Sequence, residues 1–481
     1  MTSQLPIRVR FAPSPTGMMH LGNVRAVLMN YLFAKQKHGT FIIRIEDTDQ
    51  QRNIDTGVAG ILDDILWLGL EYDEGPIKGG HYEPYFQSQR ASIYQEKLTV
   101  LQHRDLAYRC FCTTEELEKK RQRQIALKQP PRYDRTCLSL SAEQIKENLA
   151  ENKPFNWRFK LPDGTIQIND MARGTITFDM KNFSDFALTR QDGSFTFMFA
   201  NFVDDMVMVI SHVIRGEDHL TNTAGQAALY KAFNVQLPIF WHLPIIGNAQ
   251  GQKLSKRDFG FSLQDLRAAG FLPEAICNYL AIIGGGSFEQ EIMPLHELVN
   301  AMNFDNLNAT GQVRYDIEKL RWMNHKWIEK LDLVELTSRC MPFLQEQFSN
   351  INLDEATVSS LLKSLRTDLI TLADATPALQ FYFQAPQLSD AELQESIPVE
   401  TLEALKNIMR STVGLIAAES SHQFVERLKQ EAQKEKIQNK YLFWFIRLCL
   451  TGKANGPAVH ELIDLLGKTE SIKRIEAVVK I

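Results

Sequence analysis

The hydrophobic pattern of residues 7–45 predicts a strand, a helix and a second strand. Apolar and basic residues alternate over 7–11, as in a β-strand, and apolar residues then recur at helical spacing over 24–37. A second apolar run covers 41–45. Gly39 follows a basic last turn, and we expect it to supply a left-handed helix cap. This β-turn-α-β order is typical of two parallel strands joined by a right-handed crossover.

The turn before the predicted helix, residues 11–23 (FAPSPTGMMHLGN), contains two prolines, two glycines and a histidine. It follows the end of a strand and precedes the start of a helix, where open backbone N–H groups and the helix dipole favour a phosphate. The chain contains neither a G-x-x-x-x-G-K-[ST] loop nor a G-x-G-x-x-G turn here. The sequence therefore predicts a nucleotide site of another class.

From about residue 320 onward the pattern changes to successive leucine-rich helical segments with no convincing strand, which predicts an all-α carboxyl-terminal region. A length of 481 residues with 44% hydrophobic and 23% charged residues is typical of a globular protein of three or four domains. Six cysteines are too few for a disulfide framework. No apolar run reaches membrane-spanning length and no signal segment is visible, so we expect a cytoplasmic protein without a membrane partner.

The formal net charge of −5 gives no overall attraction to nucleic acid, so a polyanion would have to meet a local basic patch. Residues 119–135 form such a stretch, with Asp134 as its single acid. Such a run can grip the phosphates of an RNA acceptor stem, although a solvated helix face is its more usual meaning.

Residues 252–257 (QKLSKR) place two lysines three positions apart after a glycine-containing turn. Alone, this is most often a solvated basic loop. Together with 13–17 (PSPTG) and 20–23 (HLGN), it resembles the KMSKS and HIGH signatures of class I aminoacyl-tRNA synthetases. Three further segments resemble glutamyl-tRNA synthetases of the bacterial type in particular: RIEDTD (44–49), VIRGEDHL (213–220) and FLPEAICNYLAIIGG (271–285).

The resemblance implies an α/β, Rossmann-type catalytic domain with an inserted α+β subdomain, followed by an all-α anticodon-binding region. The expected segments are the first Rossmann half (1–109), the acceptor-stem-binding insertion (110–190), the second half with a connecting region (191–320) and the anticodon-binding domain (321–481). The implied activity is ATP- and Mg²⁺-dependent joining of L-glutamate to the 3′ end of tRNA(Glu) by a monomer. It proceeds through a glutamyl-adenylate and releases AMP and pyrophosphate.

The resemblance also implies the site residues. A carboxylate attacking the α-phosphate of ATP needs positioning and charge stabilisation more than an acid or a base. The implied catalytic residues are His20, Asn23, Lys253 and Lys256. The implied ATP-binding set consists of these four with Gly17, Gly22, Leu254 and Ser255.

The implied glutamate-binding set is Arg10, Ala12, Ser14, Glu46, Phe197, Asn201 and Arg215. Arg10 and Arg215 would meet the two carboxylates and Glu46 the α-ammonium. Taken without the motif, Arg44 and Asp47 can be an ion pair at a strand end and Glu46 a solvated turn acid. Phe197 departs from the family, which usually has a tyrosine whose hydroxyl lies near the substrate carboxylate.

Cys110, Cys112 and Cys137 resemble the zinc knuckle of some family members. Zinc needs four ligands, and Ser139 stands where a histidine could follow the third cysteine. The spacing Tyr-x-x-x-Cys of Tyr133 and Cys137 resembles that of related glutamylating enzymes, and this resemblance implies Tyr133 as the fourth ligand. A degenerate site with three free thiols is the other interpretation, and both stay open.

Two alternatives to a discriminating enzyme also remain: a ligase that charges tRNA(Gln) as well, and a non-catalytic tRNA-binding paralogue. An all-α tail argues against glutaminyl-tRNA synthetases, which read the anticodon with β-barrels.

Overall fold

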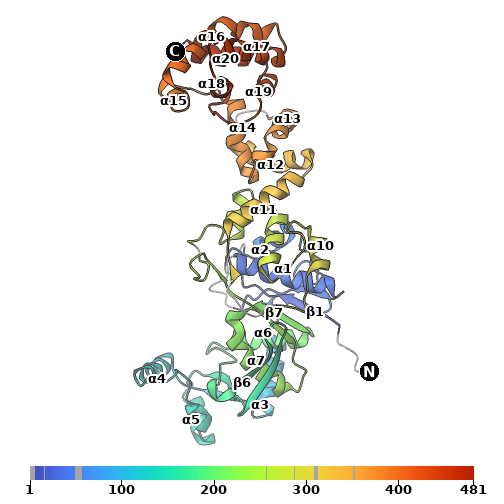
Figure 1. The fold of residues 1–481 in the computed structure, drawn as a ribbon. Helices are drawn as coiled ribbons and strands as arrows, with labels where there is room; N and C mark the ends of the chain where they lie inside the picture. Colours follow the sequence, from blue (N-terminus) through green and yellow to red (C-terminus); the bar gives the residue numbers. More distant parts are fainter. Residues whose placement is uncertain are drawn as a thin grey trace. The chain divides into compact units, whose positions relative to one another are not determined.

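The computed structural model describes residues 6–15, 17–48, 57–255, 257–285, 288–307, 313–349 and 353–480, and the chain forms two compact units (Figure 1). Unit 1 comprises residues 1–267 and 273–320, and unit 2 comprises 268–272 and 321–481. None of the described helices is long and apolar enough to cross a membrane.

Unit 1 is built around parallel strands, and the predicted strand, helix and strand are all present. β1 (Arg8–Phe11) pairs in parallel with β2 (Thr40–Ile43), and α1 (Leu21–Gln36) connects them. β7 (His212–Gly216) pairs in parallel with β8 (Ile239–Leu243). The residue before β7, Ser211, donates its backbone N–H to the carbonyl of Arg8 at 3.0 Å, so β1 and β7 lie side by side. The sheet thus joins strands that are about 200 residues apart.

The end of α1 differs from the prediction that Gly39 supplies a left-handed cap. Lys37 is the C-cap, and His38, with φ of 52°, takes the left-handed conformation. A Cβ atom on Gly39 would lie only 2.6 Å from Cγ2 of Ile7 and 2.7 Å from the Ile7 carbonyl oxygen. The prediction is therefore wrong, because it is close packing against the start of β1 that requires glycine here.

An insertion separates the two pairs of parallel strands. β3 (Ala107–Cys110) and β4 (Asn156–Phe159) are antiparallel, and the exposed helices α4 (Thr114–Ala126) and α5 (Ala142–Ala150) lie between them in sequence. β5 (Thr165–Asp170) and β6 (Gly174–Asp179) form an antiparallel hairpin, and β5 also meets β8 where Asp170 lies opposite Phe240. The hairpin therefore extends the parallel sheet, in the order β6-β5-β8-β7.

Unit 1 contains further helices and short strands. They are α2 (Gly57–Trp67), α3 (Ala91–His103), α6 (Phe197–Val207), α7 (Leu220–Phe233), β9 (Ile246–Gly247), α8 (Leu263–Ala268), α9 (Pro273–Ile283), α10 (Leu295–Ala301) and β10 (Val313–Arg314). α11 (Ile317–Lys330) contains the boundary between the two units.

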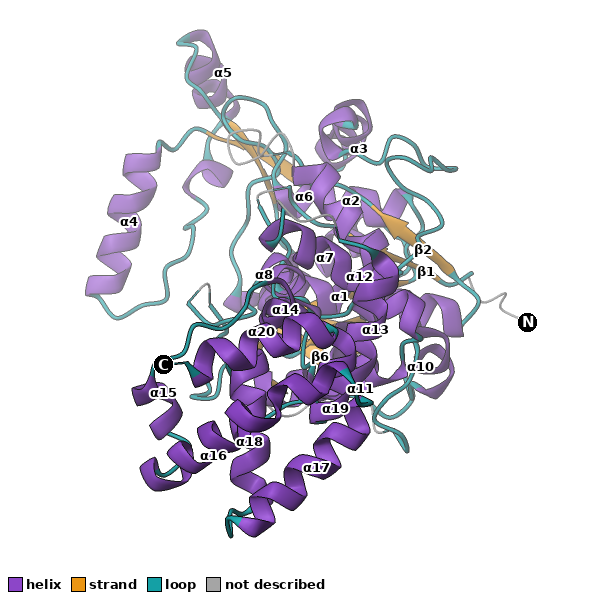
Figure 2. Cartoon of the chain, turned by 90° about the horizontal axis from the view of Figure 1, so that it is seen from above, coloured by secondary structure: helices purple, strands orange, loops and turns teal. Residues whose placement is uncertain are grey.

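Unit 2 is helical, as the leucine-rich pattern predicts. Figure 2 shows helices joined by loops in this part of the chain, and no described residue after Arg314 lies in a strand. The helices after α11 are α12 (Leu333–Gln347), α13 (Glu355–Leu365), α14 (Ala375–Phe383), α15 (Asp390–Gln394), α16 (Val399–Thr412), α17 (Ser421–Lys434), α18 (Asn439–Thr451), α19 (Val459–Leu466) and α20 (Lys468–Val479).

Candidate active site

A cavity of about 1080 Å³ opens in unit 1 where three parallel strands end. Phe11, Gly216 and Leu243, the last residues of β1, β7 and β8, all line it. In an α/β sheet the carboxyl ends of the strands are where ligands bind. Residues of both predicted sets line the cavity: Arg10, Ala12, Ser14, Gly17, His20, Gly22, Asn23, Glu46, Phe197, Asn201, Arg215, Lys253 and Leu254.

Two residues of the predicted ATP-binding set are not among those lining residues. The backbone N–H and hydroxyl of Ser255 both donate to Asp258, at 2.8 and 2.9 Å. Lys256 lies outside the described residues. Gly17 has a φ of 146°, a backbone conformation that residues with a side chain rarely adopt, which explains the glycine in this turn.

His20 is the N-cap of α1, and its cap contacts fix its tautomer. The backbone N–H of Asn23 donates to Nδ1 of His20 at 3.2 Å, while the Asn23 side chain accepts from the His20 backbone N–H at 3.4 Å. Burial, with Lys253 nearby, lowers the pKa of His20, which favours the neutral ring. Since Nδ1 is an acceptor, the neutral ring carries its proton on Nε2 and can donate it to a ligand in the cavity.

The segment after the KLSKR lysines folds back onto the HLGN turn. Leu21 N–H donates to the Phe261 carbonyl at 3.0 Å, and Leu263 N–H donates to the Met19 carbonyl at 2.8 Å. The ring centroids of Phe261 and His20 lie 5.4 Å apart. These contacts bring the two signature segments to the same cavity. Within it, Nζ of Lys253 lies 3.7 Å from a carboxylate oxygen of Asp218.

A buried charge network reaches the cavity through Arg10 and Glu46, which line it. It consists of three guanidinium groups and three carboxylates: Arg10, Arg44, Arg90, Asp204, Asp205 and Glu46. Arg10 Nε lies 3.0 Å from Asp205, and Arg44 Nη1 lies 2.7 Å from the same carboxylate. Burial raises the pKa of the Asp205 carboxyl, but these two arginines outweigh it and hold that pKa below its usual value.

The network corrects two interpretations of the RIEDTD segment. Arg44 pairs with Glu46 and with both aspartates of α6, whereas Asp47 accepts from Ser88. Glu46 is buried rather than solvated, and Asn201 Nδ2 donates to its Oε1 at 2.6 Å. Burial raises the pKa of Glu46, while Arg44 and Asn201 favour the ionised form.

Arg215 differs from the three arginines of the network, because no described residue forms an ion pair with it. Its Nη2 donates to Thr223 Oγ1 and Gln226 Oε1, both at 2.7 Å, and its Nε has no hydrogen-bond partner among the described residues. Burial, together with Arg10, lowers the pKa of Arg215 to about 10. A buried cation without a counter-ion is costly, so this site favours an anionic ligand.

Sequence reasoning misses several residues that shape this site. Asp205 and Gln226 hold Arg10 and Arg215, and Asp218 faces Lys253. Arg25, buried in α1, donates to the Pro244 carbonyl, and its Nε and Nη1 have no partner among the described residues. The only sequence signal for them is their proximity to recognised motifs, because the contacts themselves are long-range.

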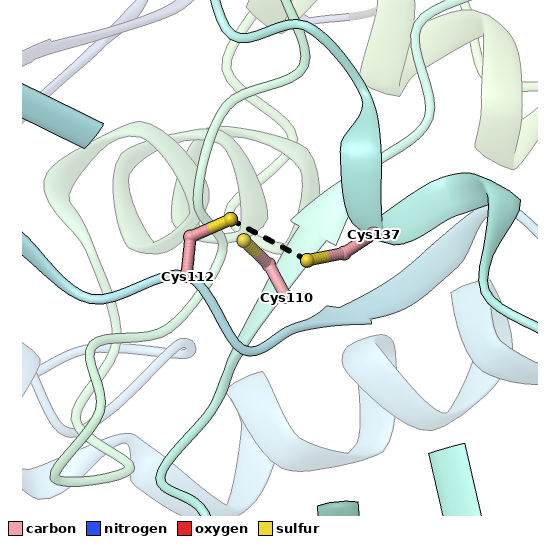
Figure 3. Close-up of side chains that lie close together, drawn as sticks. All are labelled: Cys110, Cys112 and Cys137. Carbon is pink, nitrogen blue, oxygen red and sulfur yellow. Dashed lines mark hydrogen bonds between the residues drawn. The ribbon is translucent and has the colours of Figure 1, made fainter. Parts of the chain in front are cut away.

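The three cysteines of the insertion converge at the end of β3 (Figure 3). Their sulfur atoms lie within 4.8 Å of one another, and all three side chains are buried. Tyr133 joins them: its Oη accepts from Cys110 Sγ at 3.3 Å and from the Cys137 backbone N–H at 3.0 Å. Three sulfurs and one phenolic oxygen make a donor set that fits a tetrahedral zinc ion.

Comparison with known proteins gives the same assignment along the whole chain. Residues 6–322 match the catalytic domain of class I tRNA synthetases (E and Q), and residues 335–479 match an anticodon-binding domain. The glutamate–tRNA ligase of Bacillus pumilus is 35% identical to this chain, over 98% of this chain and 99% of the relative. The glutamate–tRNA ligase of Clostridioides difficile is 36% identical, over 98% of both chains.

A solved structure shares the fold over nearly the same length. It is the glutamate tRNA ligase of Elizabethkingia meningosepticum in complex with its amino acid, with a TM-score of 0.88, 32% identity and 99% coverage of both chains. These matches confirm the family resemblance and the predicted fold class, an α/β catalytic domain followed by an all-α region. The chain belongs to the glutamate–tRNA ligase family of class I tRNA synthetases.

Proposed function

We propose that this chain joins L-glutamate to the 3′ end of tRNA(Glu) through a glutamyl-adenylate, using ATP and releasing AMP and pyrophosphate. One cavity lined by two chemically distinct sets of residues supports this activity, and we assign each set to one end of the cavity. Arg215, a buried cation without a described ion-pair partner, lies at one end together with Glu46. His20 and Lys253, which suit phosphate groups, lie at the other.

The charge balance at the first end supports glutamate as the amino acid. The three carboxylates of the network balance its three guanidinium groups, so Arg215 leaves one positive charge. Glutamate at neutral pH carries two carboxylates and one ammonium, a net charge of −1. In the proposed complex Arg215 and Arg10 meet the carboxylates and Glu46 meets the ammonium, while Ala12, Ser14, Phe197 and Asn201 complete the wall.

The second end suits ATP. The neutral His20 would donate through Nε2 to the α-phosphate as charge develops on it, with Asn23 beside it, while Gly17 and Gly22 leave room for the nucleotide. Lys253 and Lys256 would hold the β- and γ-phosphates, with Leu254 and Ser255 in the same loop. When bound with ATP, Mg²⁺ neutralises part of the triphosphate charge. No general base is required, because the glutamate carboxylate is already a nucleophile.

The tRNA would meet two separate parts of the chain. α4 and the loop after it carry the basic run 119–135, whose side chains are largely exposed and therefore available to acceptor-stem phosphates. Unit 2 contains the anticodon-binding match and would read the anticodon. We further propose that the protein acts as a monomer.

The first test is aminoacylation with labelled L-glutamate on purified tRNA(Glu) and tRNA(Gln). We expect charging of tRNA(Glu) alone, dependent on ATP. Charging of tRNA(Gln) as well would establish a relaxed ligase, in which anticodon reading does not separate the two. No charging of either tRNA by a protein that still binds ATP would contradict the proposal and favour a non-catalytic paralogue.

A second prediction concerns Phe197, the first residue of α6, which lines the cavity where the family usually has tyrosine. F197Y should lower KM for glutamate by about tenfold, because a hydroxyl hydrogen bond to a charged group contributes about 1.5–3 kcal/mol. KM for ATP should not change. F259Y, which adds a hydroxyl to an exposed ring, is the control. An unchanged KM for glutamate in F197Y would mean that other groups already satisfy the substrate carboxylate.

We also propose that Cys110, Cys112, Cys137 and Tyr133 hold one structural zinc ion. The convergence of the three sulfurs and the hydrogen bonds of the Tyr133 hydroxyl support this reading over three free thiols. The ion would tie the end of β3 to the turn that contains Cys137 and so stabilise the insertion.

Metal analysis of the purified full chain should give about one zinc per molecule. C137S should remove most of it and Y133F should weaken its retention against a chelator, since each variant deletes a ligand. C277S, which alters a buried cysteine elsewhere, should keep the zinc. A wild-type protein produced with ample zinc that contains none would overturn the assignment.

A further inference from the structure

A chain of buried hydrogen bonds runs from the hairpin of the insertion to Arg215. The carboxylate of Asp170 accepts from His242 Nδ1 at 2.7 Å, and His242 Nε2 lies 2.8 Å from Thr223 Oγ1. Thr223 Oγ1 in turn accepts from Arg215 Nη2 at 2.7 Å. Asp170, His242 and Thr223 come from β5, β8 and α7, so three separate elements meet behind one arginine.

The donor and acceptor in each of these hydrogen bonds follow from the groups at the two ends, the Asp170 carboxylate and the Arg215 guanidinium. Asp170 Oδ2 also accepts the backbone N–H of His242, at 3.1 Å, so it faces two donors and His242 Nδ1 carries a proton. Burial lowers the pKa of His242 despite Asp170, which favours the neutral ring with a free lone pair on Nε2. Thr223 then donates its proton to Nε2, and its oxygen is left to accept from Arg215. The carbonyl of His219, 3.1 Å away, is the alternative acceptor of that proton.

The surroundings make each link effective. Asp170 is 3% exposed, and His242 and Thr223 are 0% exposed, so water does not compete for these bonds. Hydrogen bonds in such a medium polarise one another, which makes the Thr223 oxygen a better acceptor. Asp170 Oδ1 is itself held by the backbone N–H groups of Ala172 and Arg173, at 3.0 and 2.9 Å.

A second branch fixes Arg215 from the other side. Gln226 Oε1 accepts from Arg215 Nη2 at 2.7 Å, and Gln226 Nε2 donates to Asn201 Oδ1 at 2.8 Å. Asn201 Nδ2 then donates to Glu46. Both described hydrogen bonds of Arg215 therefore use a single nitrogen, which leaves the rest of the guanidinium for the ligand.

We propose that Asp170, His242 and Thr223 are positioning residues that orient Arg215 before substrate binds. This inference rests on the proposed role of Arg215 in binding a glutamate carboxylate. None of the three residues lines the cavity. They act through Arg215, so their loss should weaken glutamate binding without affecting ATP.

The test compares T223V, T223S and D170N in the full chain, with steady-state aminoacylation at varied glutamate and at varied ATP. T223V keeps the shape of threonine but loses the hydroxyl, and we expect KM for glutamate to rise about tenfold with KM for ATP unchanged. T223S keeps the hydroxyl and should stay within about twofold of wild type. D170N keeps an oxygen for the backbone turn but presents a donor to His242, and should also raise KM for glutamate.

Each contrary result has a defined meaning. If T223V changes KM for glutamate and KM for ATP equally, Thr223 has a packing role and the inference is overturned. The same conclusion follows if T223S raises KM for glutamate as much as T223V does. An unchanged KM for glutamate in D170N would refute the role of Asp170 and leave Thr223 as the last positioning residue. R215K separates the two proposals: an unchanged KM for glutamate in R215K would refute the role of Arg215 itself. A raised KM in R215K with no effect of T223V would refute the positioning chain alone.

Discussion

The catalytic unit depends on two adjacent carboxylates of α6, Asp204 and Asp205, which hold three buried arginines. Arg10 lies in β1, Arg44 follows β2 and Arg90 precedes α3, so all three belong to the part of the chain before the insertion. The aspartates belong to the part after it. Buried guanidinium groups without counter-ions are destabilising, so these ion pairs constrain how the two halves of the sheet meet.

The same constraint gives the cavity its chemistry. The three arginines are neutralised by Asp204, Asp205 and Glu46, whereas the partners of Arg215 among the described residues are neutral side chains. The protein thus carries the cost of one buried positive charge until a ligand with a net negative charge arrives. In the proposed complex, selectivity for an acidic amino acid would follow from electrostatics, since a neutral ligand would leave that cost in place.

The sequence predicts much of the local structure and little of the long-range pairing. The alternation in 7–11 and the helical spacing in 24–37 correctly indicate β1 and α1, since both signals are local periodicities. The need for glycine at residue 39 is not local, because it comes from contact with Ile7. Periodicity cannot show which acid meets Arg44, and the Asp47 pairing is wrong for that reason.

Residues within recognised motifs could be predicted from the sequence, whereas the residues that support them could not. β1, the turn 11–23 and the VIRGEDHL segment place Arg10, His20 and Arg215 around one cavity. Asp170, Thr223 and His242 carry no motif that distinguishes them in the sequence, and only the fold brings them behind Arg215. Arg25 shows the same limit: its burial against the Pro244 carbonyl is visible only in three dimensions.

If an unbalanced positive charge selects the amino acid, glutamine should be a poor substrate. Glutamine has nearly the same shape as glutamate but no net charge. The measurement is kcat/KM for charging tRNA(Glu) with each amino acid under the same conditions. We expect the value for glutamine to be lower by about 100-fold or more, because the net positive charge of the site stays uncompensated. Comparable values for the two amino acids would contradict it.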